Sequence, residues 1–529
     1  MMKKNLFLKR GLALCLAVCA SVSLLAGCGG SKTETNQTEA ASETAAGDTE
    51  SGSASAEVRD TLTVALTDEP DYLSTCDHDS LMGVQMNLLT YNGLIRIDME
   101  TLEPVCDLAE SYSQDSDTEW TFTLKEGVKF HNGDDFTADD VVASIEYAQS
   151  FPATATYTAA IDSVEAVSPS TVKITTSAPT PNLLYDLAYH YNFIVPRSLI
   201  ESGNDFSANP VGTGPFRFVE WNKGNSIVFE AFEDYFDADR KASIPTLKFV
   251  MIPEGATRTM SLESGEVDFV YSVASSDIDR LMSTDGIAVE QVVSVENFFL
   301  FLNCVNTPFT DANLRKAVSY AINREDIVAG ALNGYGTPSY SCVSMGYAES
   351  TDENGYTYDL DKAKEYLEAW GGDPSAVTLD IICSNDTKTA IATIMQAELA
   401  QIGINVSINE MDSASYQAAM RTTDLTSAIV SWSPANAMTY VQRFHSDRRN
   451  QTPACMVDDN LDVLVEEMNT TMDNEARAEM ITSIIAEVND LCPFVPVYQV
   501  NYFRAHDAAL QNVVCSATGY VDFCTMSWN

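Results

Sequence analysis

The sequence contains few of the residues and motifs that build metal centres and hydrolase active sites. Five histidines occur among 529 residues, at positions 78, 131, 190, 445 and 506, and none lies in an HExxH pattern. The chain also lacks a CxxC pair and a GxSxG turn. A zinc site requires clustered Cys and His ligands. We therefore expect no catalytic site, no metal site and no cofactor. A glycosidase that uses a pair of carboxylates has no short sequence motif, so the missing motifs do not exclude it.

Basic residues are scarce as well. The chain has 30 Lys and Arg against 76 Asp and Glu, for a formal net charge of −46. Nucleic-acid binding requires a basic face and is excluded. The charge suits the solubility of an exported protein, and it could also favour cationic ligands by electrostatic steering. After the N-terminus no stretch reaches the roughly 18 apolar residues that span a membrane. The length predicts two or three domains.

The N-terminus has the three parts of an export signal. Four Lys and Arg precede an apolar stretch, residues 12–26, and "LLAGC" ends at Cys28. This pattern resembles the bacterial lipobox, which implies cleavage after residue 27 and lipidation of Cys28. Residues 28–57 are acidic and poor in large apolar side chains, as in a flexible tether. We predict a lipid-anchored protein on the extracellular face of the membrane, with a tether length that suits a Gram-positive cell wall.

Cysteine count predicts at least one unpaired thiol. Of twelve cysteines, Cys15 and Cys19 leave with the signal and Cys28 carries lipid. Nine remain, an odd number, and their pairing cannot be deduced from their spacing. These are Cys76, Cys106, Cys304, Cys342, Cys383, Cys455, Cys492, Cys515 and Cys524.

An acidic cluster in "FHNGDDFTADDVVASIEYA", residues 130–148, tests the metal hypothesis directly. Its aspartates do not alternate as in a calcium loop, and no closing Glu follows. Thr137 and Asp140 instead have the spacing of a helix capping box. The residues before them alternate as in a strand, and Asn132-Gly133 is a turn signal. We interpret the segment as strand, turn and capped helix.

Other segments have equally clear local patterns. Two alternating strands surround a hairpin turn at residues 222–225. "LRKAVSYAINREDIV", residues 314–328, predicts one amphipathic helix. Residues 390–408 predict a helix that Gly403 ends, followed by a strand.

Several of these blocks together resemble one family. Residues 108–148, "LAESYSQDSDTEWTFTLKEGVKFHNGDDFTADDVVASIEYA", are similar to the hallmark segment of the peptide/nickel class of extracellular solute-binding proteins. These proteins are the receptors of oligopeptide-type ABC importers. "TLTVALTDEPDYLSTCD" and "NPVGTGPFRFVEWNKG" resemble further family blocks in the expected order.

The resemblance implies an α/β fold of the bilobal periplasmic-binding-protein kind, with mixed sheets, a β-rich insert and a hinge between the lobes. Lobe I would comprise residues 58–92, 195–294 and 495–529. The insert would be residues 93–194, and lobe II residues 295–494. Ligand would be enclosed between the lobes by hinge closure. The receptor would act as a monomer with ABC permease subunits as partners.

The resemblance also implies which residues contact the ligand. One element is an extended segment after the first strand, another follows the Ser-Gly-Glu turn, and the last two are a basic residue and a tryptophan loop. The matching positions are Asp79, Ser80, Leu81, Tyr271, Ser272, Arg421, Trp432, Ser433 and Asn436.

The tryptophan loop departs from the peptide-receptor pattern. Those receptors have an aspartate three residues after the tryptophan, which binds the ammonium group of the peptide, and this chain has Ala435 there. Asn436 could only accept a weaker hydrogen bond. Oligopeptides remain the first expectation for the ligand, and oligosaccharides or a metal chelate are alternatives within the family. An exported hydrolase is the remote alternative.

Overall fold

The computed structural model describes residues 59–77, 80–420, 422, 425–448 and 458–529. Cys28, Asp79, Arg421 and Cys455 lie outside these ranges. Within them, no helix combines the length and apolar character needed to cross a bilayer. The eight cysteines of the described part are all free thiols, so the prediction of an unpaired cysteine is confirmed.

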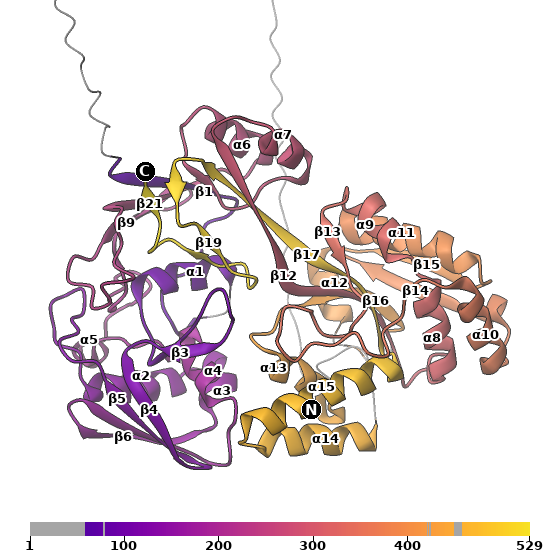
Figure 1. Cartoon of the computed structure of the whole chain (residues 1–529), viewed down its shortest axis with the longest axis horizontal. Coiled ribbons are helices and arrows are strands. Elements are labelled where there is room, and N and C mark those ends of the chain that lie inside the picture. Colours follow the sequence, from indigo (N-terminus) through magenta and orange to yellow (C-terminus); the bar gives the residue numbers. More distant parts are fainter. Residues whose placement is uncertain (1–58, 78–79, 421, 423–424, 449–457) are drawn as a thin grey trace, which may run out of the picture. The chain divides into compact units, whose positions relative to one another are not determined.

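One mixed sheet organises most of the described chain. Two long antiparallel strands, β12 (Ile287–Leu302) and β17 (Phe494–Asp507), lie at its centre. In Figure 1 they run from the part near α6 and α7 to the part that contains α13 to α15. Their register shifts between Val293 and Asn297, so the pairing is interrupted midway along the strands. The two strands therefore link the two ends of the sheet.

The remaining strands add to the two sides of this centre. On one side lie β16 (Ser427–Trp432), β14 (Thr378–Cys383) and β15 (Asn405–Glu410), and β13 (Gly336–Pro338) pairs with β17. On the other side lie β11 (Phe269–Val270), β1 (Thr61–Leu66), β10 (Thr246–Met251), β9 (Ser226–Ala231) and β8 (Phe216–Asn222). Parallel and antiparallel pairs both occur, which confirms the expected mixed α/β sheet.

We call residues 295–494 the second-lobe region. Its helices are α8 (Ala312–Ala321), α9 (Arg324–Ala331), α10 (Leu360–Trp370), α11 (Asp386–Ala400), α12 (Ser413–Ala419), α13 (Ala437–Val441), α14 (Asp459–Thr470) and α15 (Asn474–Leu491). These helices cover both faces of the sheet. Alternate residues of β12 point to opposite faces, so each face has its own apolar core. Phe299 and Phe301 pack in one core, and Leu300 and Leu302 pack in the other.

We call residues 93–194 the insert region. It contains a hairpin, β2 (Ile95–Ile97) with β3 (Pro104–Cys106), and a four-stranded sheet of β4 (Ala109–Ser116), β5 (Glu119–Leu124), β7 (Thr171–Thr176) and β6 (Ile161–Ser168). Its helices are α2 (Ala138–Gln149), α3 (Ala155–Thr158) and α4 (Leu183–Ala188), and α5 (Arg197–Ser202) follows it. These elements share a separate apolar core.

The rest of the chain forms the first-lobe region, residues 59–92, 195–294 and 495–529. Its helices are α1 (Leu81–Thr90), α5, α6 (Gly255–Glu263) and α7 (Ile278–Met282). Two small hairpins near the C-terminus pair β18 (Leu510–Gln511) with β21 (Ser527–Trp528) and β19 (Val514–Cys515) with β20 (Val521–Asp522). The region bounds are those predicted from the sequence, and they stay a prediction.

The acidic cluster at residues 131–140 has the structural role expected of it. The carboxylate of Asp140 accepts hydrogen bonds from the backbone N–H of Thr137 at 2.9 Å and from its hydroxyl at 3.0 Å. His131 lies against the glycine-rich crossing, with Nε2 at 2.9 Å from the carbonyl oxygen of Gly214. Burial lowers the pKa of His131 to about 4, so the ring is neutral at physiological pH. The segment joins the insert region to the first-lobe region.

One predicted helix is wrong. Residues 314–328 form not one helix but the end of α8 and the start of α9, because Ile322 adopts an extended backbone. Asn323 then caps α9 by accepting from the backbone N–H groups of Glu325 and Asp326. Arg324 is fully buried and donates to the carbonyls of Ser339, Pro496, Ser319 and Ile322. The amphipathic pattern of apolar residues continues through the break, so the sequence gives no sign that one helix ends and another begins there.

Candidate functional site

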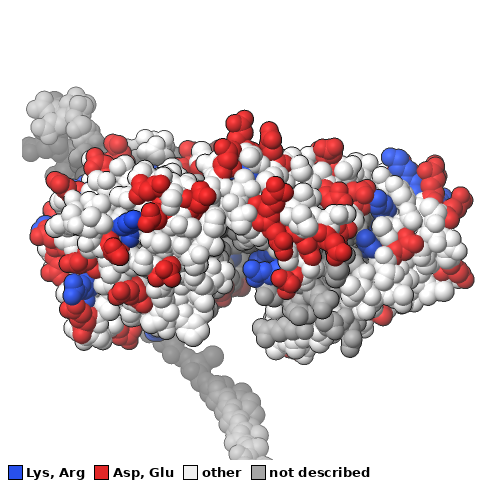
Figure 2. Space-filling model, turned by 90° about the horizontal axis from the view of Figure 1, so that it is seen from below, with Lys and Arg blue, Asp and Glu red and all other residues white. Residues whose placement is uncertain are grey.

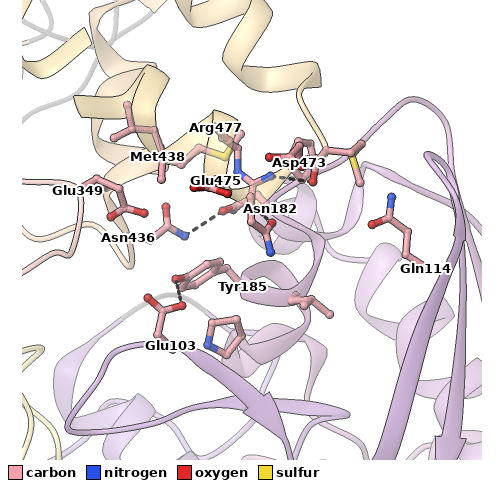
Figure 3. A pocket seen from close by; sticks show the side chains of 18 of the residues that line it. Glu103, Gln114, Asn182, Tyr185, Glu349, Asn436, Met438, Asp473, Glu475 and Arg477 are labelled. Atoms are coloured by element: carbon pink, nitrogen blue, oxygen red, sulfur yellow. Dashed lines mark hydrogen bonds between the residues drawn. The ribbon is translucent and has the colours of Figure 1, made fainter. Parts of the chain in front are cut away.

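A cavity of about 610 Å³ lies where the insert region meets the second-lobe region. Figure 3 shows its lining, and Figure 2 shows an acidic surface with a hollow between the two halves of the molecule. On the insert side, β3 to β5 and α4 contribute Glu103, Tyr112, Gln114, Trp120, Asn182 and Tyr185. On the other side, α13, α15 and their flanking loops contribute Glu349, Asn436, Met438, Asp473, Glu475 and Arg477. We call this space the acidic cavity.

One side-chain hydrogen bond crosses the acidic cavity. Nδ2 of Asn436 donates to Oδ1 of Asn182 at 2.9 Å (Figure 3). Asn436 is also the N-cap of α13, and its Oδ1 accepts from the backbone N–H of Thr439 at 2.8 Å. Asn182 in turn donates to the carboxylate of Asp186 at 2.9 Å. Asn436 therefore already uses its amide in holding the two regions together.

Carboxylates dominate the charge of this cavity. Glu103, Glu349, Asp473 and Glu475 face one arginine, Arg477. The guanidinium of Arg477 donates to the backbone carbonyls of Thr471 and Met472, at 3.0 and 3.3 Å, so it supports the start of α15. Burial, followed by the charge of Glu103 at 3.1 Å from its hydroxyl, raises the pKa of Tyr185. The cavity therefore suits donor or cationic groups better than anions.

Trp432 lies at the end of β16 inside a cluster of aromatic rings. Its ring centre is 4.7 Å from that of Phe494, 5.6 Å from Phe299, 5.8 Å from Tyr440 and 6.2 Å from Phe444. We call these five residues the Trp432 cluster. Trp432 remains partly exposed and Ser433 is exposed. The ring is thus both packed and accessible, which allows it to be a platform for a ligand.

Arg443 covers one face of the Trp432 ring. Its guanidinium carbon is 5.1 Å from the ring centre, within cation–π range. Arg443 belongs to the 3-10 turn Gln442–Phe444 that follows α13. Burial lowers the pKa of its guanidinium, and Tyr440 and Tyr157 are the next neighbours to affect it. Tyr157 lies in α3 of the insert region, so Arg443 faces that region from the opposite side.

The predicted contacts in the first-lobe region are engaged within the protein. Tyr271 is 3% exposed, and its hydroxyl lies 2.7 Å from the carbonyl oxygen of Gly519 and 3.0 Å from Oε1 of Gln85. Arg504 stacks over its ring at 4.5 Å. Ser272 has an exposed side chain, while its carbonyl accepts from Arg258 at 3.0 Å.

Ser80 and Leu81 differ from the extended segment that the sequence suggested. Ser80 is extended, but it is the N-cap of α1 and its hydroxyl accepts from the backbone N–H of Gly83 at 3.3 Å. Leu81 is the first residue of that helix and its side chain is 41% exposed. Only the residue before the helix could add to a ligand strand. Asp79 and Arg421 lie outside the described residues.

Sequence reasoning missed Asn182, which lines the acidic cavity, and it also missed Arg443 over the Trp432 ring with Tyr157 near it. Arg443 lies eleven positions after Trp432 in the same loop, and the turn between them could not be read from the residue pattern. Asn182 and Tyr157 belong to a region far away in the chain. Contact between them and the second-lobe region is a tertiary feature without a local signal.

The mixed sheet runs from the first-lobe region into the second-lobe region, and the acidic cavity lies between the insert region and the second-lobe region. A family model described as bacterial extracellular solute-binding proteins, family 5, middle part, matches residues 103–452. The chain belongs to this family of extracellular solute-binding proteins. The expected resemblance and the periplasmic-binding-protein fold are confirmed.

Known relatives and structures agree with this assignment. The chain is 31% identical over 332 residues to the glutathione-binding protein GsiB of Pectobacterium atrosepticum, an alignment that covers 61% of this chain and 63% of the relative. Helicobacter pylori DppA in complex with the peptide STSA has a TM-score of 0.73 at 22% identity and covers 88% of this chain and 98% of its own. AgaA of A. tumefaciens in complex with agropinic acid has a TM-score of 0.72 at 25% identity and covers 89% and 99%.

Proposed function

We propose that this chain is a receptor that captures a solute, foremost an oligopeptide, between its lobes and delivers it to the permease subunits of an ABC importer. The observation that carries the proposal is the cleft. A cavity of about 610 Å³ lies between the insert region and the second-lobe region, and Asn436 of the tryptophan loop lines it. The partly exposed Trp432 of the same loop lies outside this lining. Membership of family 5, and relatives named for glutathione and peptides, support a peptide-like solute.

The free N-terminus of a peptide is not the expected anchor. The position that would carry an aspartate is Ala435, and the neighbouring Asn436 has its amide oxygen and nitrogen engaged with Thr439 and Asn182. A charge-assisted bond to an ammonium group therefore has no acceptor at this loop. Backbone pairing and aromatic contact with Trp432 remain as the sources of peptide affinity. Ser80, Leu81, Ser272 and Ser433 complete the proposed contact set.

The same proposal includes the location of the receptor and its lack of turnover. Cleavage of the export signal and lipidation of Cys28 would anchor the protein on the outer face of the membrane, as a monomer on the tether of residues 28–57. Delivery of an intact solute requires no catalysis, so the protein is proposed as a binder and not an enzyme.

A thermal-shift screen of residues 58–529, which form one compact unit, tests the proposal. The panel contains di- to hexapeptides, their N-acetylated forms, glutathione, cello- and xylo-oligosaccharides and nickel chelates. A ligand at 100 times its Kd stabilises a protein by about 2.7 kcal/mol. Equal shifts with free and N-acetylated peptides would support a peptide receptor without an ammonium anchor. Shifts with sugars or nickel chelates alone would replace the peptide assignment, and no shift with any compound would overturn solute capture of these classes.

A further inference from the structure

The turn between β2 and β3, residues 98–103, carries a buried apolar side chain, that of Leu102. Leu102 is 6% exposed, although Thr101 before it and Glu103 after it are both exposed. Its side chain belongs to the apolar core that contains Phe299 and Phe301, and the other buried residues of that core all lie within residues 295–494. The Leu102 side chain therefore extends from the insert region into the core of the second-lobe region.

The backbone at Leu102 is unfavourable for leucine. Its φ of 61° lies in the left-handed region, where the Cβ atom comes too close to the following carbonyl oxygen. Asn333, Asn354 and Asn512 have similar positive φ values, which asparagine tolerates better. Turn chemistry alone would thus favour Asn or Gly over Leu at this position. The contact that the side chain makes in the other region accounts for the leucine.

Hydrogen bonds within the turn hold Leu102 in place. The carboxylate of Asp98 accepts from the backbone N–H of Glu100 at 3.1 Å, from that of Thr101 at 3.0 Å and from the Thr101 hydroxyl at 3.1 Å. The backbone N–H of Leu102 donates to the Asp98 carbonyl at 2.9 Å. Because the turn is ordered by its own bonds, little conformational entropy opposes the docking of Leu102.

The insert region is joined to the first-lobe region through the backbone. The N–H of His131 donates to the Gly212 carbonyl at 2.9 Å, and the N–H of Ile194 donates to the Asn92 carbonyl at 2.8 Å. Backbone bonds of this kind favour movement of the insert region and the first-lobe region as one body.

Contact with the second-lobe region is made instead by side chains. Leu102 packs in the second-lobe core, and Met472 of the second-lobe region packs against the insert core. The chain connects the two sides through β12 and β17, whose pairing is interrupted between Val293 and Asn297. Bending at this interruption would pull Leu102 out of its core without breaking a strand ladder.

We propose that the turn of residues 98–103 is a latch, in which Leu102 docks in the second-lobe core when the lobes close and returns to water when they open. Docking also completes the acidic cavity, because the next two residues, Glu103 and Pro104, line it. The latch stabilises the closed arrangement through contacts within the protein. The inference therefore goes beyond the proposed function and holds for any solute.

The test measures opening of the lobes in residues 58–529 with no solute added. Spin labels are attached to noncanonical amino acids, since the described part of the chain has eight free thiols. One pair, at the exposed positions Glu165 and Glu467, spans the insert and second-lobe regions. A reference pair, at Glu165 and the exposed Glu220, spans the insert and first-lobe regions. Pulsed electron paramagnetic resonance gives the distance distribution of each pair.

Three variants separate the latch from general effects on the insert region. Leu102→Asn removes the apolar side chain and suits the left-handed backbone. Leu102→Met keeps an apolar side chain of similar volume. The matched control is Val167→Asn, which makes the same kind of change at a side chain of the insert region that is 63% exposed.

We expect Leu102→Asn to raise the ratio of open to closed molecules at least tenfold, seen as longer distances between positions 165 and 467. Tenfold corresponds to about 1.4 kcal/mol, which is within what the burial of a leucine side chain supplies. Leu102→Met and Val167→Asn should keep the wild-type distribution. The distance between positions 165 and 220 should be the same in every variant.

Each other outcome counts against the latch. An unchanged distribution in Leu102→Asn, an equal shift in Val167→Asn, or a wild type that populates only the open distance would overturn it. A change in the reference pair would do so as well, since Leu102 would then support the insert region itself. Should Leu102→Asn fail to fold, Leu102→Ala decides by the same criteria. None of these results touches the proposed function, because no solute takes part, and the thermal-shift screen tests that function separately.

Discussion

The first-lobe region and the second-lobe region differ in how far the residues predicted to contact a ligand are engaged within the protein. On the first-lobe side, the Tyr271 hydroxyl lies at hydrogen-bond distance from Gly519 and Gln85, and Ser80 caps a helix. On the second-lobe side, Trp432 is partly exposed and Arg443 has no hydrogen-bond partner within the described part of the chain. Groups that already bond within the protein gain little from a ligand, whereas a partly exposed aromatic ring can still pack against one. The comparison predicts that selectivity resides mainly in the second-lobe region.

Removal of the Trp432 ring should cause the largest changes in stability and in ligand affinity. Trp432→Ala deletes contacts with Phe494, Phe299 and Tyr440 and should lower the free energy of unfolding by about 3 kcal/mol. It also removes the surface on which Arg443 lies, so affinity for a solute found in the screen should fall at least tenfold. Chemical denaturation and calorimetry measure the two effects.

A matched variant separates packing from recognition. Trp221→Ala removes a partly exposed tryptophan from the hairpin of β8 and β9, where its Nε1 donates to Glu69 at 3.0 Å. This change should lower stability without a change in affinity. If both tryptophan variants bind equally well, Trp432 has only a packing role and the contrast between the two sides is lost.

A buried carboxylate on the insert side should make stability depend on pH. Burial raises the pKa of Asp186 from its ordinary value of 3.8 to about 7, against the opposing hydrogen bond from Asn182. Between these values the unfolded chain releases a proton that the folded chain retains, so stability should fall as pH rises from about 4 to about 7 and then level off. Asp186→Asn should raise the free energy of unfolding at pH 7.5 by on the order of 2 kcal/mol.

Denaturant titrations of Asp186→Asn and the wild type at pH 4.5, 6 and 7.5 measure this effect. The difference between the two proteins should be smallest at pH 4.5, where Asp186 is protonated in the folded state. A constant difference across the three pH values would show that Asp186 does not titrate in this range. Asp186 would then make no contribution to the pH dependence of the free energy of unfolding.

The sequence was sufficient where a structural feature depends on neighbouring residues. The strand and capped helix of residues 119–149 and the hairpin of β8 and β9 were predicted, because alternation, turns and caps are local signals. The break between α8 and α9 was missed, since its cause includes the burial of Arg324 against β17. Arg443 was missed for the same kind of reason. Its position over the Trp432 ring is a tertiary contact, and no residue pattern displays that.

Removal of the Tyr271 hydroxyl tests the first-lobe region, and the expected effect is smaller. Tyr271→Phe leaves the ring under Arg504 and deletes the hydrogen bond to the Gly519 carbonyl, which should cost about 1 kcal/mol of stability. Affinity for the solute should change by less than about twofold, since the hydroxyl already bonds Gly519 and Gln85 within the protein. Denaturation and calorimetry on the same preparation give both values. A tenfold loss of affinity at unchanged stability would place Tyr271 in direct contact with the solute.

The smallest expected effect concerns the bond that crosses the acidic cavity. Asn182→Ala removes the acceptor for Asn436 and a donor to Asp186, while Asn436 still caps α13 through Thr439. Stability should fall by less than about 1 kcal/mol, because Asn436 and Asp186 each keep room beside the cavity for another hydrogen-bond partner. If this bond holds the lobes closed around the solute, the dissociation rate should rise about threefold, with a smaller change in the association rate. Stopped-flow measurements decide this, with Asn204→Ala, an insert-flanking surface residue bonded to the Asn209 carbonyl, as the control. An unchanged dissociation rate would mean that closure depends on the solute itself and not on this hydrogen bond.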